Sequence, residues 1–377
     1  MSAWTPQVFV PYPDHPGVLM ARVAARSAAF EGATAVAGAE VIVGSATGHD
    51  RDQVVRGARG ELLERMGNIV AGREAEAAAA GTVATWSELR REGVPALEPP
   101  VRPEERRLWV RGRTVRGAEI RVPAGSAYLR HRPPPGCGAA PSAGSTGVAS
   151  HPDREAAARH AAWEVLERDL VRRSWYGPAA WPPYRLPGEL GGALGALTEA
   201  RGLVVTALAL PAPAGAACVV ACLHRPDGTG QAFGARCGPP DTLPALVEKA
   251  AYEALMVRWS MGTETARRAW AQWHGTTPPG TAVQHALWAY HRQDSLSLWG
   301  PARAPEGDPP GARTRSAPAG PSDPLRILAE HTGQDVVLVD TTSRPARDAG
   351  VHVVRVIAPG ALPLPTGSGP GRPHPFG

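Results

Sequence analysis

Lysine is almost absent from this sequence, and its scarcity excludes whole classes of nucleotide and cofactor chemistry. The 40 Lys and Arg residues include a single lysine, Lys249, which stands in Leu-Val-Glu-Lys-Ala-Ala with no glycine nearby. A Walker A phosphate loop needs glycines before its lysine, so this sequence has none. Schiff-base and pyridoxal phosphate chemistry would depend on Lys249 alone. The dinucleotide fingerprint and the hydrolase nucleophile turn are missing as well.

Cysteine, long apolar runs and clustered charge are also lacking. Four cysteines are too few for a disulfide framework in 377 residues. No stretch approaches about 18 uninterrupted apolar residues, so we expect no transmembrane helix and no membrane partner. The N-terminus has neither the basic nor the apolar region of a secretory signal, which favours a cytoplasmic protein. The net charge of +5, with arginines interleaved with acids, weighs against nucleic acid as a partner.

The cysteines leave two interpretations open. Cys218, Cys222 and His224 would share one face of a strand, with Cys237 nearby, so a zinc site is conceivable. The sequence has no Cys-x-x-Cys pair, however, and these residues lie in an apolar strand pattern. Buried small hydrophobic residues are therefore the favoured interpretation.

Hydrophobic residues make up 43% of the chain, which supports a real core. Periodicity and capping residues predict helices over 50–69, 153–173 and 243–261. Short Val-rich runs predict strands, at 39–43, 119–123, 203–210, 217–223, 335–340 and 352–357. Helices and strands that do not alternate strictly indicate an α+β (mixed α/β) fold. We expect a single domain over 1–377, with a mobile low-complexity insertion at 303–324 and a Pro-rich tail at 360–377.

A motif that occurs twice carries the chemical signal. The first predicted helix contains Glu61, Glu64 and Arg65, and the second contains Glu164, Glu167 and Arg168 with the same spacing. Each pair of glutamates lies on one helix face. Mg²⁺ commonly bridges carboxylates to nucleotide phosphates, and arginine offers forked donors to phosphate oxygens. A surface ladder of Glu and Arg is the alternative. The small-residue turns expected at 44–48 and 145–150, one before each helix, favour a ligand site.

These segments resemble the YcaO family. Residues 145–169, from Ser145-Thr-Gly-Val-Ala-Ser to Glu164-x-x-Glu-Arg-Asp169, match its nucleotide motif in residues and spacing. Residues 41–65 match the family's earlier Gly-Lys-Gly…Glu-x-x-Glu-Arg segment, and 335–360 are similar to its C-terminal strand pair. The last six residues, Arg-Pro-His-Pro-Phe-Gly, are similar to the tail of azoline-forming members. The resemblance covers most of the chain.

The resemblance implies an ATP- and Mg²⁺-dependent cyclodehydratase of a ribosomally made precursor peptide. In azoline-forming members a Cys, Ser or Thr side chain adds to the preceding carbonyl, the resulting oxygen is phosphorylated by ATP, and phosphate leaves to give a thiazoline or oxazoline. It also implies three groups of site residues. They are Glu61, Glu64, Glu164 and Glu167 for metal; Ser145, Gly147, Glu155, Arg168 and Arg258 for the nucleotide; and the tail residues Pro373, Pro375 and Gly377 for catalysis, Gly377 through its terminal carboxylate as proton acceptor.

Three positions depart from the family pattern. Thr47 stands where the family has a phosphate-facing lysine, Gly57 where it has a serine, and Met256 where it has a glutamine. These departures bear on ATP affinity and motivate one alternative, a non-catalytic scaffold of the same pathway. The other alternative is the same fold forming a macroamidine or a thioamide, against which the tail argues.

The resemblance also indicates partners. The family-like region begins almost at the first residue, so we expect a separate ThiF-like, leader-binding protein. A flavin-dependent azoline dehydrogenase is expected from the pathway and a homodimer from the family, in a setting such as thiopeptide antibiotic biosynthesis.

Overall fold

The computed structural model of this chain describes residues 4–32, 40–78, 82–99, 102–138, 144–301, 322–365 and 371–376. The insertion predicted at 303–324 lies almost wholly outside the described residues, and Gly377 lies outside them too. No helix of the described ranges is both long enough and apolar enough to cross a membrane.

The strands are mostly short and Val- or Ala-rich. They are β1 (Gln7–Phe9), β2 (Leu19–Arg26), β3 (Val41–Gly48), β4 (Thr82–Ala84), β5 (Arg107–Thr114), β6 (Glu119–Pro123), β7 (Val148–His151), β8 (Tyr184–Leu186), β9 (Val204–Leu210), β10 (Ala217–His224), β11 (Ala232–Gly238), β12 (Val337–Asp340) and β13 (His352–Ile357).

The helices are α1 (Arg51–Ala77), α2 (Trp86–Arg91), α3 (Ala124–Ala127), α4 (Arg154–Tyr176), α5 (Gly192–Ala200), α6 (Leu243–Met261), α7 (Glu264–Trp273), α8 (Ala282–His291), α9 (Pro324–Thr332) and α10 (Arg344–Asp348). Three short 3₁₀ turns accompany them, at Ala28–Phe30, Pro240–Thr242 and Ser297–Trp299.

The strands form three antiparallel sheets. The N-terminal sheet has the order β1-β2-β3, and a second sheet has the order β11-β10-β9-β8. The largest sheet has the order β4-β5-β12-β13-β7, with β6 beside β5. In that sheet β12 and β13 pair antiparallel, which brings the two predicted C-terminal strands side by side.

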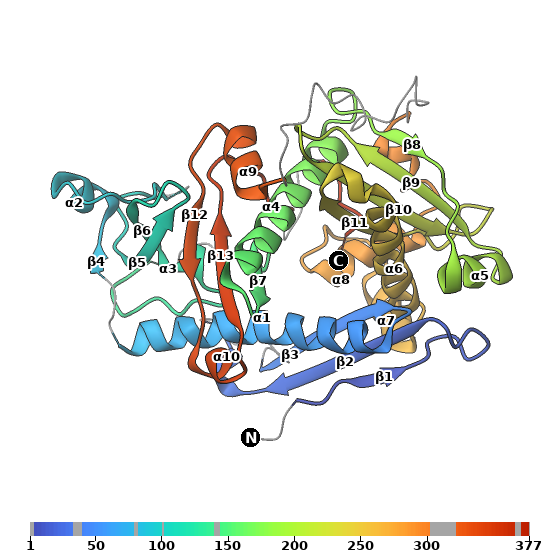
Figure 1. The fold of residues 1–377 in the computed structure, drawn as a ribbon, viewed down its shortest axis with the longest axis horizontal. Helices are drawn as coiled ribbons and strands as arrows, with labels where there is room; N and C mark the ends of the chain where they lie inside the picture. Colours follow the sequence, from blue (N-terminus) through green and yellow to red (C-terminus); the bar gives the residue numbers. More distant parts are fainter. Residues whose placement is uncertain are drawn as a thin grey trace.

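Three helices connect these sheets. Helix α1 packs on β3 and also reaches β7 and β13, while α4 packs on β13, β7 and β11. Helix α6 packs on β11 and β10 and touches β3. In Figure 1, α1 runs below the large sheet toward the N-terminal sheet, with α4 and α6 rising above it. Each of these three helices therefore bridges two of the sheets.

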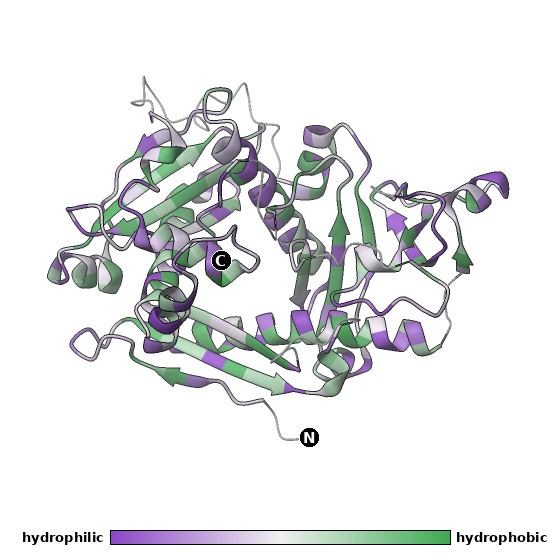
Figure 2. Ribbon diagram, turned by 180° about the vertical axis from the view of Figure 1, so that it is seen from behind, coloured by the Kyte–Doolittle hydropathy of each residue, from purple (hydrophilic) through white to green (hydrophobic). Residues whose placement is uncertain are grey.

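Burial follows the sequence pattern. The central strands of the sheets are mostly hydrophobic, whereas hydrophilic and hydrophobic residues alternate along α1 (Figure 2). The largest core cluster lies between α4 and the strands β10 and β11, around Trp175, Phe233 and Trp299. Aromatic rings of this size bury much apolar surface each and anchor the helix to the sheet.

The α+β prediction is confirmed, and several boundaries agree. The predicted helix 243–261 and the predicted strands 119–123 and 352–357 match α6, β6 and β13. Helices α1 and α4 begin after Asp50 and Asp153, whose carboxylates accept the N–H groups of Gln53 and Ala156. These caps satisfy N–H groups that have no partner in the first helical turn.

Two local predictions are wrong. The segment 44–48 is the second half of β3, because its small residues pair across the sheet with β2 instead of turning. The turn predicted at 145–150 ends early, because its second half lies in β7, where Ser150 pairs with Val353 of β13. In both places small residues serve close packing of a strand against α1, and the same residue types also favour turns.

Two glycines allow helices to approach strands closely. A Cβ at Gly44 of β3 would lie 2.1 Å from the Ala58 carbonyl oxygen of α1, and one at Gly234 of β11 would lie 2.2 Å from the Ala250 carbonyl oxygen of α6. Real Cβ atoms do not come this close, and in both cases the clashing atom is backbone. Each helix can therefore pack this closely against its strand only because the strand has a glycine at the contact.

We expect Gly44→Ala to lower the free energy of unfolding by about 1–3 kcal/mol, the cost of overpacking a close contact. Urea unfolding followed by circular dichroism measures this. The matched control is Gly191→Ala, because a Cβ there meets nothing within 4 Å. An equal loss in both variants would contradict the role assigned to Gly44.

Candidate functional site

Four glutamates of the repeated motif lie on two helices that share a support. Glu61 and Glu64 belong to α1, and Glu164 and Glu167 belong to α4. Both helices pack against β7 and β13. Burial raises the pKa of Glu64, and the nearby charge of Glu164 raises it further. The fold thus brings the two copies of the motif together.

Each sheet contributes one backbone N–H to one of these carboxylates. The N–H of Ser45, in β3, donates to Glu61 Oε2 at 2.5 Å. The N–H of Gly147, just before β7, donates to Glu164 Oε2 at 3.0 Å. The N–H of Cys237, in β11, donates to Glu167 Oε2 at 3.1 Å. The three donors fix the orientation of three side chains at the junction of the sheets.

Gly147 is required at its position. Its φ is +82°, and a Cβ would lie 2.6 Å from the Val356 carbonyl oxygen and 2.7 Å from Val165 Cγ2. Any other residue would be strained by the left-handed backbone conformation, and its Cβ would clash with both of these atoms. The predicted small-residue turn at 145–147 therefore exists, and its N–H reaches Glu164 because glycine is there.

The carboxylates lie in an environment that disfavours their charge. Burial raises the pKa of Glu64 well above its ordinary range, and repulsion from Glu164 adds to it. Burial also raises the pKa of Glu164 and lifts that of Glu167 to about 7. Acidic groups whose charge is undercompensated in this way are typical of functional sites.

Arginines compensate only part of this charge. Arg65 pairs with Glu61 at 2.6 Å. Arg168 Nη1 lies 3.4 Å from Glu167 Oε1, yet within the described residues neither atom makes a hydrogen bond. Glu64 makes no hydrogen bond to the described residues. Buried polar groups left in this state are costly, and such groups point to a missing ligand.

Three further charged residues belong to this group and were not predicted. Arg355 of β13 lies within the fields of Glu64 and Glu164, and burial lowers its pKa to about 10. Arg236 of β11 pairs with Glu253 of α6 at 2.6 Å. In the sequence each of these arginines stands alone in an apolar strand pattern, Arg355 in Val-Val-Arg-Val-Ile and Arg236 in Phe-Gly-Ala-Arg-Cys. That pattern was the signal that could have identified them. A charge there needs a buried partner.

The tail docks beside this group. The Pro373 carbonyl accepts from Trp175 Nε1 at 3.0 Å, and the Arg372 guanidinium lies 4.5 Å from the centre of the Trp175 ring. Pro375 is buried, and Phe376 is 3% exposed against Trp299 and Phe233. Arg168 lies 5.9 Å from the centre of the Phe376 ring. The tail therefore ends its described course next to the α4 motif.

The remaining predicted residues fall in different places. Ser145 lines a cavity of about 320 Å³ together with Arg65 and Arg130, next to the Glu61 side of the group. Glu155 is on the surface, with its side chain 86% exposed and 3.6 Å from Arg159. Arg258 donates to the Gly230 carbonyl and lines a cavity that contains none of the four glutamates.

The three departures from the family pattern have structural counterparts. Met256 lines a mostly apolar slot of about 180 Å³ between β2, β3 and α6, together with Ser45. The Thr47 hydroxyl is buried and makes no hydrogen bond within the described residues. A Cβ at Gly57 would lie 2.9 Å from the Ala46 Cβ, so a serine would not fit there without a shift.

The sequence matches the family model of the YcaO cyclodehydratases, described as ATP- and Mg²⁺-binding, over residues 45–362. The chain belongs to the YcaO family. It is 29% identical over 264 residues to an uncharacterized protein of Methanothermobacter thermautotrophicus and spans 64% of the length of that relative.

Solved structures share the fold. The YcaO protein of Methanopyrus kandleri, bound with AMPPCP and Mg²⁺, aligns over 95% of this chain and 88% of its own, with a TM-score of 0.62 and 20% identity. A heterocyclase in complex with substrate and cofactor aligns over 95% of this chain and 50% of its own, with a TM-score of 0.70 and 17% identity. The E. coli microcin synthetase complex contains a chain with a TM-score of 0.60 and 12% identity, aligned over 95% of this chain and 89% of that one.

The carboxylate group fits the Mg²⁺ that this YcaO membership implies. Within the described residues, no three His, Cys, Asp or Glu side chains are close enough to hold an ion by themselves. Mg²⁺ does not need such a cage, because it keeps several waters and is usually bound through one or two carboxylates plus substrate phosphates. Glu167 Oε1, which makes no hydrogen bond within the described residues, and the raised pKa of Glu64 mark carboxylates that a cation would satisfy.

The cysteines that the structure describes form no metal site. Cys218, Cys222 and Cys237 are buried, and Cys218 lies directly opposite Cys237 in the sheet. Burial raises the pKa of the Cys222 thiol, which keeps it protonated. They pack in the core as small hydrophobic residues.

Docking of the tail depends on a neutral His374. Its Nε2 lies 2.9 Å from the Pro365 carbonyl oxygen, its Nδ1 accepts the Phe376 N–H, and its ring stacks 3.8 Å from His285. Burial, with smaller contributions from His285 and Arg168, lowers its pKa to about 3. A second ring proton would face the Phe376 N–H.

Because this folded pKa lies below the ordinary 6.5, the stabilisation is complete above about pH 6.5 and is lost as the pH falls toward 3. We expect the melting temperature to fall by several degrees more in the wild type than in His374→Gln between about pH 7.5 and 5.5. Scanning calorimetry at both pH values checks this. An equal fall in both proteins would contradict the assignment to His374.

Proposed function

We propose that this YcaO protein is an ATP- and Mg²⁺-dependent enzyme that converts Cys, Ser or Thr residues of a ribosomally made peptide to thiazolines or oxazolines. The observation that carries the proposal is the group of carboxylates, Glu167 buried and the others half-buried, that α1 and α4 bring together beside Arg168 and Arg355. Phosphoryl transfer requires mainly positioning and charge neutralisation, and this group supplies both.

The charged residues of this group have different proposed roles. Glu61, Glu64, Glu164 and Glu167 are the proposed Mg²⁺ ligands, one or two of them to an ion together with phosphate oxygens and water, and the bound ion would neutralise phosphate charge. Arg168 has an Nη1 with no hydrogen bond within the described residues, so it offers a donor to a phosphate oxygen. Arg355 lies in the field of Glu64 and Glu164 and limits their repulsion. Each role uses a group that the fold leaves incompletely satisfied.

The slot lined by Met256 is the proposed place for the base. It is mostly apolar, and Ser45 lines it while its N–H donates to Glu61, so the slot adjoins the carboxylate group. The aromatic base of a nucleotide would gain apolar contacts from the side chains that line such a slot. The Met256 side chain offers packing and no hydrogen bond, which predicts weaker selection among bases than a glutamine would give.

In the proposed reaction the side-chain oxygen or sulfur of the substrate bonds to the preceding carbonyl carbon. The former carbonyl oxygen then attacks the γ-phosphorus of ATP and ADP leaves. Phosphate then departs with that oxygen as the amide nitrogen loses its proton and the C–N double bond forms. Together with the proton lost from the side-chain O–H or S–H, the peptide has lost one water, and one phosphate is released. The docked tail, with Pro373, Pro375 and Phe376, closes the site beside Arg168; the terminal carboxylate of Gly377 as proton acceptor stays a prediction. A separate leader-binding protein is the proposed partner.

A cysteine-rich precursor peptide incubated with this protein, the leader-binding partner, Mg²⁺ and ATP tests the reaction. We expect intact mass to show the loss of one water per modified residue, matched by one phosphate released. ATP consumption without that mass change would indicate macroamidine or thioamide chemistry instead. Neither signal, with the partner bound, would favour the non-catalytic scaffold that Thr47, Gly57 and Met256 motivate.

We expect Glu167→Gln to lower peptide turnover by about a hundredfold or more, since even an outer partner of a metal ligand costs up to that much. The change keeps the shape of the side chain and removes its charge. The control is Glu119→Gln, on β6, where the side chain is 68% exposed. Equal turnover in Glu167→Gln and wild type would remove Glu167 from the site.

Deleting residues 373–377 should abolish turnover while nucleotide binding stays within about twofold of wild type, because the carboxylates belong to α1 and α4. Isothermal titration with a non-hydrolysable ATP analogue and the mass assay give the two readouts, and a melting curve shows that the variant is folded. Unchanged turnover in a folded variant would contradict the role of the tail.

A further inference from the structure

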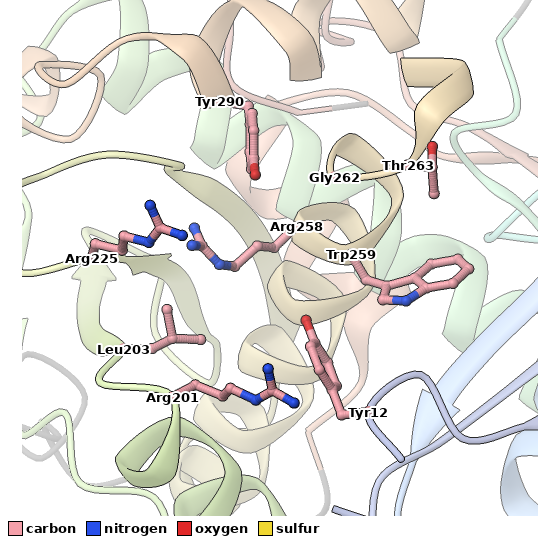
Figure 3. Close-up of a pocket in the computed structure, with 9 residues that line it drawn as sticks. All are labelled: Tyr12, Arg201, Leu203, Arg225, Arg258, Trp259, Gly262, Thr263 and Tyr290. Atoms are coloured by element: carbon pink, nitrogen blue, oxygen red, sulfur yellow. The ribbon is translucent and has the colours of Figure 1, made fainter. Parts of the chain in front are cut away.

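A second cavity, lined by none of the four glutamates, gathers positive charge. It has a volume of about 360 Å³ and is lined by Arg201 at the end of α5, Arg225 after β10 and Arg258 on α6. Figure 3 shows the guanidinium groups of Arg225 and Arg258 directed toward each other, with the Tyr290 ring above them. None of the residues that line it is acidic.

The three arginines are only partly compensated. Arg201 pairs with Asp14 outside the cavity and lies 5.0 Å from the centre of the Tyr12 ring. Among the residues that the structure describes, Arg258 donates only to a neutral carbonyl, that of Gly230. Within the described residues the Arg225 guanidinium has neither a hydrogen bond nor an ion pair. Like charges that face one another without an anion between them are unfavourable, so this arrangement is suited to a bound anion.

The shape of the cavity favours an extended ligand. Arg225, Arg258 and Tyr290 also line a neighbouring cavity of about 240 Å³, which continues past Gly230 to His291 and Gln293. The two cavities therefore share a positively charged wall. Tyr12, Trp259 and Tyr290 add aromatic surface, and aromatic and arginine side chains are the residues that anchor peptides at interfaces. A single small ion would use little of this surface.

We propose that this cavity binds an acidic segment of a peptide, whose carboxylates pair with Arg225, Arg258 and Arg201 while its backbone lies against the tyrosines. Guanidinium groups bind carboxylates through two parallel hydrogen bonds, which gives orientation as well as affinity. The inference rests on the proposed function and deepens it, since the acidic segment would belong to the peptide that the enzyme modifies. It places the recognition of that peptide on α6 and the β10–β11 loop.

A fluorescein-labelled hexaglutamate peptide is the probe, with hexaglutamine as its neutral counterpart. Fluorescence anisotropy at low salt should show binding of hexaglutamate and none of hexaglutamine. We expect Arg225→Gln to raise the Kd about tenfold, the effect of losing one charge-assisted pair, and Arg225→Gln/Arg258→Gln to raise it further. Arg113→Gln is the matched control, because Arg113 is an exposed arginine on β5.

Several results would overturn the proposal. Absence of hexaglutamate binding would do so, and an equal loss in Arg113→Gln would show only general attraction to a basic protein. Displacement of the probe by millimolar pyrophosphate, with no preference for the peptide, would show a phosphate site instead. The Arg225 guanidinium makes no hydrogen bond or ion pair within the described residues, and both Arg225 and the nearby Asp227, whose pKa its charge lowers, are exposed. Arg225→Gln should therefore fold normally, and a melting curve checks this.

This binding assay is independent of turnover. Glu167→Gln should bind hexaglutamate as the wild type does, because the two sites share no residue. If the carboxylate group has no catalytic role, the mass assay fails while the anisotropy result stands. If the arginine cavity has no peptide-binding role, the anisotropy result fails while model substrates are still modified.

Discussion

The gathering of half-buried carboxylates on α1 and α4 is the constraint on which the rest of this structure depends. Burial raises the pKa of Glu64, the charge of Glu164 raises it further, and Arg65, Arg168 and Arg355 balance the two glutamates only in part. Such a pair is unfavourable on its own and persists because the surrounding fold determines it. Membership of the YcaO family gives the reason for keeping it, since the family binds ATP and Mg²⁺.

The backbone of the fold offsets the free-energy cost of holding these carboxylates close together. Gly44 and Gly234 let α1 and α6 lie against their strands, and Gly147 turns its N–H toward Glu164. One N–H from each sheet orients one carboxylate, so the site exists only where all three sheets meet. The tail then covers the α4 side through Trp175 and Phe376. The sheets, the helices and the tail thus all position or cover one group of charged residues.

Much of this is predictable from the sequence, and the rest is not, for identifiable reasons. The repeated Glu-x-x-Glu-Arg motif has a fixed helical spacing, so the sequence alone places its two glutamates on one face of each helix. The turn at 145–147 follows from its glycine. The segment 44–48 is ambiguous because small residues serve turns and tight strand packing equally well. Arg236, Glu253 and Arg355 join the group through contacts between distant segments, which local patterns do not encode. The arginine cavity, built from separate loops and helices, is equally beyond such patterns.

The most direct test of the central claim is to locate the metal. Crystals grown with a non-hydrolysable ATP analogue and Mn²⁺, which accepts the same oxygen ligands as Mg²⁺, would show the ion by its anomalous scattering. We predict an anomalous peak between α1 and α4, within bonding distance of carboxylate oxygens from both copies of the motif. The phosphates should reach Arg168. A nucleotide bound in the arginine cavity, with no metal between the two helices, would contradict it.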